Sequence, residues 1–205
     1  MPEYTVHYFG LYARAEPTRM ALAHAGADWH DNRISNWPEV KASMPNGQVP
    51  ALELADGTLM GQSLAILRFV GMKFGYMPTD AMEAFHVNYL VDRFQDIAGL
   101  YYKPIFAAED AKEALYTQIF DDAVPKFLAE IDHYCAKGSW LVGDKLSIAD
   151  FTIGGFYANT FKNPACYTPE RWAALAEKFP NFHAYGERFV AENEKYLSSR
   201  PSAAV

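Results

Sequence analysis

The spacing of hydrophobic and polar residues changes several times near the start of the chain. Residues 5–9 are β-branched and aromatic and Gly10 ends the run, which predicts a strand. Over 15–25 the apolar residues recur with helical spacing, and Gly26 is a typical stop signal for a helix. Residues 28–34 predict a second strand. A strand, a helix and a strand over this distance form a βαβ unit, whose two strands lie parallel.

A short helix, a hairpin and a longer helix are expected next. Residues 35–41 predict a short helical segment, because Pro38 fits the first turn of a helix. Residues 51–54 and 58–60 flank an Asp-Gly turn, which is the sequence signal of a β-hairpin. Helical spacing resumes at 61–63, and the free N–H groups at the start of that helix favour an anion.

The β signals end near residue 81, and helical periodicity recurs from there on. Gly and Pro within 75–78 interrupt the preceding helix. We therefore predict an α/β domain over 1–75, a linker over 76–81 and an all-helical domain over 82–205. Within the last of these, helices are expected over 82–106, 111–134, 147–161, 169–178 and 182–191.

Ser147 and Asp150 stand just ahead of an apolar run with the S-x-x-D spacing of a capping box. In a capping box the two side chains bond the free N–H groups of the first helical turn. We therefore assign Asp150 to folding and not to catalysis.

Composition narrows the class of protein. Half of the 205 residues are hydrophobic and 21% are charged, so the chain can bury a sizeable core. The formal charge of −7 argues against a nucleic-acid partner or an anionic membrane surface. Cys135 and Cys166 are too few for a disulfide framework and have no metal-ligand spacing, so no metal is expected. No signal peptide or membrane span is predicted, and a cytoplasmic location is expected.

Tyr8 is the first candidate for chemistry. It ends the first predicted strand just before a helix N-terminus, where free N–H groups and the helix dipole favour negative charge. Its phenol could therefore meet an anionic ligand. The alternative is a half-buried strand aromatic with a structural role, as most strand tyrosines have.

The Val49–Pro50 bond is the second candidate feature. Pro50 stands at the start of a strand, where a cis bond is cheap, and a cis bond would turn the Val49 backbone toward an extended peptide. Together with the two helix N-termini, this layout suits a small peptide with carboxylates at both ends.

Several stretches carry a resemblance to a known family. The sequence resembles the glutathione transferases, most closely the sigma class, which also contains the glutathione-dependent prostaglandin D synthases and the S-crystallins. The resemblance covers essentially the whole chain and implies a thioredoxin-like N-terminal domain, a βαβ-α-ββα arrangement, followed by an all-helical C-terminal domain. The motifs that carry it are Tyr8-Phe9, Arg14-Ala15-Glu16, Trp37-Pro38-Glu39-Val40-Lys41, Pro45-Asn46-Gly47-Gln48-Val49-Pro50 and Gly61-Gln62-Ser63-Leu64-Ala65-Ile66.

The resemblance implies glutathione as co-substrate and assigns roles to named residues. Tyr8 would donate a hydrogen bond to the glutathione sulfur, and Arg14 would add positive potential. An alternative for Arg14 is a structural ion pair with Glu16. The residues that would hold glutathione are Tyr8, Trp37, Lys41, Gln48, Val49, Pro50, Gln62, Ser63 and Asp96.

Within that set, Trp37 and Lys41 resemble the pair that meets the glycine carboxylate, and Gln62 and Ser63 the pair that meets the γ-glutamyl carboxylate. Asp96 resembles the acid that reaches the γ-glutamyl ammonium across the interface of a homodimer. Its alternative is an i, i+3 partner of Arg93 on a solvated face.

The resemblance also implies a pocket for a small hydrophobic electrophile. An aromatic lining suits flat apolar compounds. The expected lining is Phe9, Arg14, Tyr101 or Tyr102, Phe106 and Tyr157. Ala13, where many sigma-like chains have glycine, and Tyr12 depart from the family pattern and are expected to reshape the pocket entrance.

Three functions agree with these features. The first is a glutathione transferase that conjugates the thiolate to small hydrophobic electrophiles. The second is a glutathione-dependent isomerase of the prostaglandin type. The third is a crystallin-like or ligand-binding protein without activity, which a long insertion between the fourth and fifth helices or the loss of glutathione contacts would favour. Neither feature is visible in the sequence, and the residues that would stabilise the thiolate are all present, so we expect an enzyme.

Overall fold

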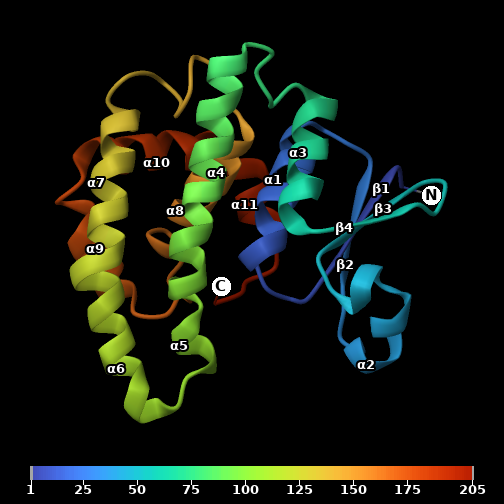
Figure 1. Cartoon of the computed structure of the whole chain (residues 1–205), viewed down its shortest axis with the longest axis horizontal. Helices are drawn as coiled ribbons and strands as arrows, with labels where there is room; N and C mark the ends of the chain where they lie inside the picture. Colours follow the sequence, from blue (N-terminus) through green and yellow to red (C-terminus); the bar gives the residue numbers. More distant parts are fainter. Residues whose placement is uncertain (1, 205) are drawn as a thin grey trace.

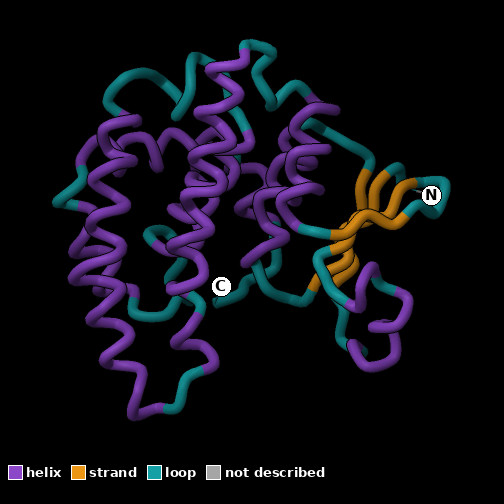
Figure 2. Tube along the Cα trace, in the orientation of Figure 1, coloured by secondary structure: helices purple, strands orange, loops and turns teal. Residues whose placement is uncertain are grey.

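The computed structural model describes residues 2–204. The sheet, which has four strands, stands at one end of the molecule, and most of the rest is helical (Figure 1). Strands are confined to the N-terminal part, and only helices and loops follow (Figure 2). The expected fold class, an α/β unit followed by an all-helical one, is confirmed.

The sheet has the strand order β2-β1-β3-β4. β1 (Tyr4–Tyr8) runs parallel to β2 (Trp29–Arg33), as the βαβ pattern predicts. β3 (Ala51–Leu54) runs antiparallel to β1, and β4 (Leu59–Gly61) closes the predicted hairpin with it. The last residue of β1, Tyr8, therefore stands at the edge where the chain leaves the sheet for the first helix.

Helices and short turns connect the strands. In the N-terminal half they are η1 (Ala13–Ala15), α1 (Glu16–His24), α2 (Trp37–Val40), η2 (Lys41–Ser43), η3 (Pro45–Gly47) and α3 (Ser63–Phe74). In the C-terminal half they are α4 (Ala81–Tyr101), α5 (Lys103–Phe106), α6 (Glu109–Thr117), a π-helical segment (Gln118–Ala123), α7 (Val124–Cys135), α8 (Ile148–Thr160), α9 (Pro169–Ala176), α10 (Pro180–Glu192) and α11 (Glu194–Ser199).

Two expected helices are interrupted, and both interruptions precede a proline. The helix expected over 82–106 ends at Tyr101, and α5 restarts just before Pro104. The helix expected over 111–134 widens into the π-helical segment just before Pro125. Proline has no backbone N–H to donate within a helix, and its ring clashes with the carbonyl group four residues earlier. The helix therefore breaks or widens before each proline.

α1 and α3 connect the sheet to the helical part. They contact each other, and both contact α8, so they lie between the sheet and the C-terminal helices (Figure 1). Phe151 of α8 and Phe189 of α10 are fully buried in the same apolar cluster as Val6 and Tyr8 of β1. The two halves therefore share a core, and a site between them has rigid walls.

The capping box of α8 is confirmed. Asp150 is fully buried, and its carboxylate accepts hydrogen bonds from the Ser147 N–H and hydroxyl, each at 2.8 Å. The Leu141 N–H at 3.0 Å and the Tyr185 hydroxyl at 3.1 Å also donate to it. One side chain thus joins the start of α8 to the preceding loop and to α10.

We predict that Asp150→Ala lowers the free energy of unfolding by about 3 kcal/mol or more, because it leaves several buried donors without an acceptor. Urea unfolding of the purified protein measures this. Asp150→Asn, which keeps one acceptor oxygen, should lose less. Equal stability of the wild type and the alanine variant would contradict a structural role for Asp150.

Candidate active site

Tyr8 lies at the junction of the two halves. Tyr8 is 7% exposed, and burial raises the pKa of its phenol above the usual range. The Arg14 backbone N–H and the positive charges of Arg14 and Arg19 oppose part of that rise. The phenol therefore keeps its proton at neutral pH and can act as a hydrogen-bond donor to an anion beside Arg14.

The loop after Tyr8 is held from inside the protein by Arg19 of α1. The Arg19 guanidinium donates to the carbonyl oxygens of Phe9 at 3.2 Å and Leu11 at 2.5 Å, and it lies 5.6 Å from the centre of the Tyr8 ring. Sequence reasoning missed Arg19. The spacing of Glu16 and Arg19, one helical turn apart, is the signal that pointed to it.

The charge of Arg19 is neutralised inside the core. Its side chain and that of Glu16 are both fully buried, 3.3 Å apart, and its Nε donates to Asp31 at 2.9 Å. Glu16 also accepts from Tyr196 and Arg200, so the alternative pairing of Arg14 with Glu16 is not found. Arg14 is exposed and forms no ion pair with any other residue within 2–204.

An aromatic row runs from Tyr8 toward α2. The rings of Tyr8 and Phe9 lie 5.5 Å apart, and Phe9 meets Trp37 edge to face at 5.4 Å. Phe9 therefore packs beside the expected glutathione site, and it does not line the pocket where the electrophile was expected.

Lys41, just after α2, lies beside Gly47 and so near Gln48. Gly47 has a positive φ of 60°, and a Cβ at that position would lie 3.5 Å from the Lys41 Cε, so the lysine stem runs across the glycine. The exposed Gln48 side chain lies beside Gln62, with 3.5 Å between its Oε1 and the Gln62 Nε2. Trp37, Lys41, Gln48 and Gln62 thus belong to neighbouring surface segments.

The start of α3 carries backbone strain. Gln62 occupies the N-cap position of the helix with φ 70° and ψ 106°, a backbone conformation that residues other than glycine rarely adopt. Strain of this kind is typical of functional sites. The adjacent Val49–Pro50 bond is cis, as predicted from the sequence. Ser63, the first residue of α3, lines a small cavity together with Arg14 and Tyr102.

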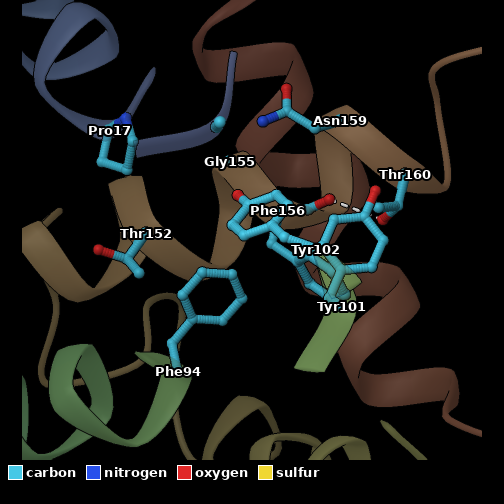
Figure 3. A pocket seen from close by; sticks show the side chains of 10 residues that line it. Pro17, Phe94, Tyr101, Tyr102, Thr152, Gly155, Phe156, Asn159 and Thr160 are labelled. Atoms are coloured by element: carbon cyan, nitrogen blue, oxygen red, sulfur yellow. Dashed lines mark hydrogen bonds between the residues drawn. The ribbon is translucent and has the colours of Figure 1, made fainter. Parts of the chain in front are cut away.

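A second cavity adjoins the first between α1, α4 and α8 (Figure 3). Pro17 stands on the α1 side, Phe94 belongs to α4, and Thr152 and Phe156 belong to α8 (Figure 3). The full lining is Ala13, Pro17, Phe94, Tyr101, Tyr102, Thr152, Gly155, Phe156, Asn159 and Thr160. Its surface is mainly apolar and suits a small hydrophobic molecule. Sequence reasoning found the two tyrosines and missed the α8 residues.

Tyr102 connects the two cavities, since it lines both. Burial raises the pKa of its phenol, and the positive charge of Arg14 opposes part of that rise. The Tyr102 phenol therefore shares a cavity with Arg14 and stays protonated at neutral pH.

Besides Phe9, two more residues expected in the electrophile pocket lie away from this cavity, and those predictions are wrong. Phe106 is 86% exposed, because the break before Pro104 places it on α5, away from the cavity. Tyr157 is fully buried and packs against α10, where its hydroxyl contacts His183 at 2.7 Å and also Glu187. Helical periodicity placed Tyr157 on α8 correctly but could not tell which face turns inward.

Asp96 lies apart from the other expected glutathione residues. Its side chain is 71% exposed and accepts from Arg93 one turn earlier at 3.3 Å, which is the alternative weighed from the sequence. A link to glutathione through Asp96 needs a second subunit.

Residues 2–204 hold no group of three or more His, Cys, Asp or Glu side chains placed to bind a metal ion. In the same part of the chain, every helix is too short or too polar to cross a bilayer. Both cysteines are free and buried.

Comparison with known proteins identifies the family. Residues 13–72 match the model described as "Glutathione S-transferase, N-terminal domain", and residues 95–200 match "Glutathione S-transferase, C-terminal domain". The chain is 34% identical to probable glutathione S-transferase 7 of Caenorhabditis elegans over 212 aligned positions. This alignment covers 98% of each chain. The chain is 30% identical over 209 positions to hematopoietic prostaglandin D synthase of Gallus gallus, which covers 100% of each.

A solved structure agrees with these matches. The structure of monomeric Na-GST-3, a glutathione S-transferase of the hookworm Necator americanus, matches with a TM-score of 0.86 at 28% identity. The superposition covers 99% of this chain and 100% of the Na-GST-3 chain. The chain belongs to the glutathione S-transferase family, which uses glutathione as co-substrate.

We predict that Gln62→Gly raises the free energy of unfolding by about 1 kcal/mol, because glycine relieves backbone strain worth roughly 1–3 kcal/mol at the cost of a more flexible unfolded chain. Gln62→Ala, which removes the same side chain and keeps the strain, is the matched control and should gain no stability. Urea unfolding of both variants measures this. A glycine variant no more stable than the alanine variant would show that Gln62 is unstrained.

Proposed function

We propose that this protein conjugates the glutathione thiolate to small hydrophobic electrophiles. The observation that carries the proposal is the position of Tyr8, whose buried phenol lies beside Arg14. Arg14 and the preceding Ala13 line the cavities next to α4 and α8. A nucleophile held by Tyr8 would thus have an apolar pocket next to it. Turnover of glutathione with a panel of small chloronitroaromatic compounds tests the proposal.

The chemistry asked of the protein is to stabilise a thiolate. An ordinary thiol is mostly protonated at neutral pH, and the thiolate is the nucleophile. The Tyr8 hydroxyl would donate a hydrogen bond to the sulfur anion, and the Arg14 charge would favour the same anionic form. The thiol proton leaves to solvent, the sulfur forms a bond to the electrophilic carbon, and the leaving group departs with its electron pair.

The residues around Tyr8 fit a tripeptide with two carboxylates and one ammonium. The Lys41 ammonium and the Trp37 indole N–H would meet the glycine carboxylate, with Gln48 beside them. The N-terminus of α3 at Gln62 and Ser63 would receive the γ-glutamyl carboxylate. We further propose that the Val49 backbone, next to Pro50, pairs with the cysteinyl part of glutathione.

A second function is supported by a named relative. Hematopoietic prostaglandin D synthase of Gallus gallus matches this chain over its whole length, which supports a glutathione-dependent isomerase of the same general class. An endoperoxide substrate in the same turnover panel separates isomerisation from conjugation.

We also propose membership of the sigma class, a cytoplasmic location, and the division into a domain over 1–75, a linker over 76–81 and a domain over 82–205.

We propose a homodimer, supported by one exposed face of α4. Met82, Phe85 and Tyr89 are 62%, 56% and 39% exposed and recur at the spacing of a single helix face. Asp96 continues the same spacing seven residues after Tyr89. An isologous contact through this face would cover the apolar residues and bring Asp96 toward the other subunit.

We predict that Tyr8→Phe lowers kcat by roughly 100-fold and changes glutathione affinity much less, since it removes one donor to a developing anion. Steady-state kinetics and calorimetric titration with glutathione measure the two effects. Tyr4→Phe, a buried phenol of the same strand bonded to Glu3, is the matched control and should keep its activity. Unchanged turnover in Tyr8→Phe would remove Tyr8 from the mechanism.

We predict that Asp96→Asn weakens glutathione binding by about 1.5–3 kcal/mol, the range for a hydrogen bond to a charged group, and leaves the fold intact. Titration calorimetry measures the affinity, and sedimentation at micromolar protein should show a dimer. Asp110→Asn, an exposed acid on α6, is the control. Heterodimers of Asp96→Asn and Tyr8→Phe chains should have one site with both lesions and one with neither. A fully active monomer would contradict the shared site.

A further inference from the structure

Residues 200–203 lie against the loop that leads to Arg14. The Tyr12 hydroxyl donates to the Pro201 carbonyl oxygen at 3.1 Å and accepts from the Ala203 N–H at 3.2 Å. These contacts join residues about 190 positions apart in the sequence. Tyr12 is 4% exposed, so the end of the described chain and the start of α1 are packed together.

Arg200 fixes the same tyrosine from a second side. Its guanidinium lies over the Tyr12 ring, 3.8 Å from the centroid, a stacked cation–π contact. One nitrogen, Nη1, also donates to Glu16 at 2.6 Å and to Asn159 at 2.8 Å. The Arg200 side chain is only 7% exposed. A single guanidinium therefore joins the loop, the start of α1 and the α8 wall of the hydrophobic cavity.

The held tyrosine precedes a strained residue. Ala13 has a φ of 35°, in the region that L-residues avoid, and Arg14 follows it directly. A strained conformation persists only when its surroundings hold it. Arg19 holds the loop through hydrogen bonds to Phe9 and Leu11. The contacts to Tyr12 hold the loop up to the residue that precedes Ala13.

We propose that Tyr12, Arg200 and the 201–203 backbone form a clamp that positions Arg14 for thiolate stabilisation. The inference rests on the proposed roles of Tyr8 and Arg14. In the clamp, Tyr12 and Arg200 are positioning residues, because neither touches the proposed thiolate. Asn159, which the clamp also bonds, lines the hydrophobic cavity, so the same contacts set one wall of the electrophile pocket.

The test uses Tyr12→Phe, which keeps the ring under Arg200 and removes both hydrogen bonds to the backbone of Pro201 and Ala203. Two readouts are needed at pH 7: the ultraviolet absorbance of the thiolate of bound glutathione, and kcat and KM for glutathione measured separately. We expect a smaller thiolate signal and a kcat lower by about three- to tenfold, with KM changed less than about twofold. Arg200→Met should act in the same direction, and Arg200→Lys, which keeps the charge near Glu16, should restore part of the loss.

Tyr76→Phe is the matched control, since it removes one phenol hydrogen bond, to His24, which lies at the other end of α1 from this loop. It should keep both the thiolate signal and kcat. A folded Tyr12→Phe protein with an unchanged thiolate signal and kcat overturns the clamp, as does an equal loss in Tyr76→Phe. Tyr8→Phe is measured in parallel: a full thiolate signal there overturns the proposed role of Tyr8, whereas loss in Tyr8→Phe with none in Tyr12→Phe overturns the clamp alone.

Discussion

The buried ion pair between Glu16 and Arg19 is the constraint on which the site depends. Both side chains are fully buried, and an uncompensated charge in such a place costs several kcal/mol. Asp31 and Arg200 complete the pairing, and the remaining Arg19 donors bond the carbonyl oxygens of Phe9 and Leu11. The loop between the first strand and the first helix is therefore part of the core.

That constraint explains how the two halves of the chain cooperate. The sheet presents Tyr8 at its edge, the fixed loop presents Arg14, and α8 supplies the wall of the hydrophobic cavity. Strained backbone at Ala13 and at Gln62 lies on either side of the cavity that Arg14 and Ser63 line. Strain concentrates where function requires a shape that the chain would not choose by itself.

Local patterns predicted much of the fold, because they are set by neighbours in sequence. The βαβ unit, the Asp-Gly hairpin and the capping box at Ser147 and Asp150 depend on spacing alone, and all three are confirmed. The sites of Tyr157 and Phe106 were misjudged, because periodicity does not reveal which face of α8 is buried or how Pro104 turns the chain. Arg200 could not be found, since Glu16 and Tyr12, the partners that tie it to the start of the first helix, are more than 180 residues away in sequence.

The position of the glutathione sulfur in a crystal structure of the complex tests the account most directly. We predict that the sulfur lies at hydrogen-bond distance, about 3–3.5 Å, from the Tyr8 hydroxyl oxygen, on the side that faces Arg14 and the cavity between α1, α4 and α8. A bound glutathione whose sulfur points away from Tyr8, with Arg14 remote from it, would contradict the account.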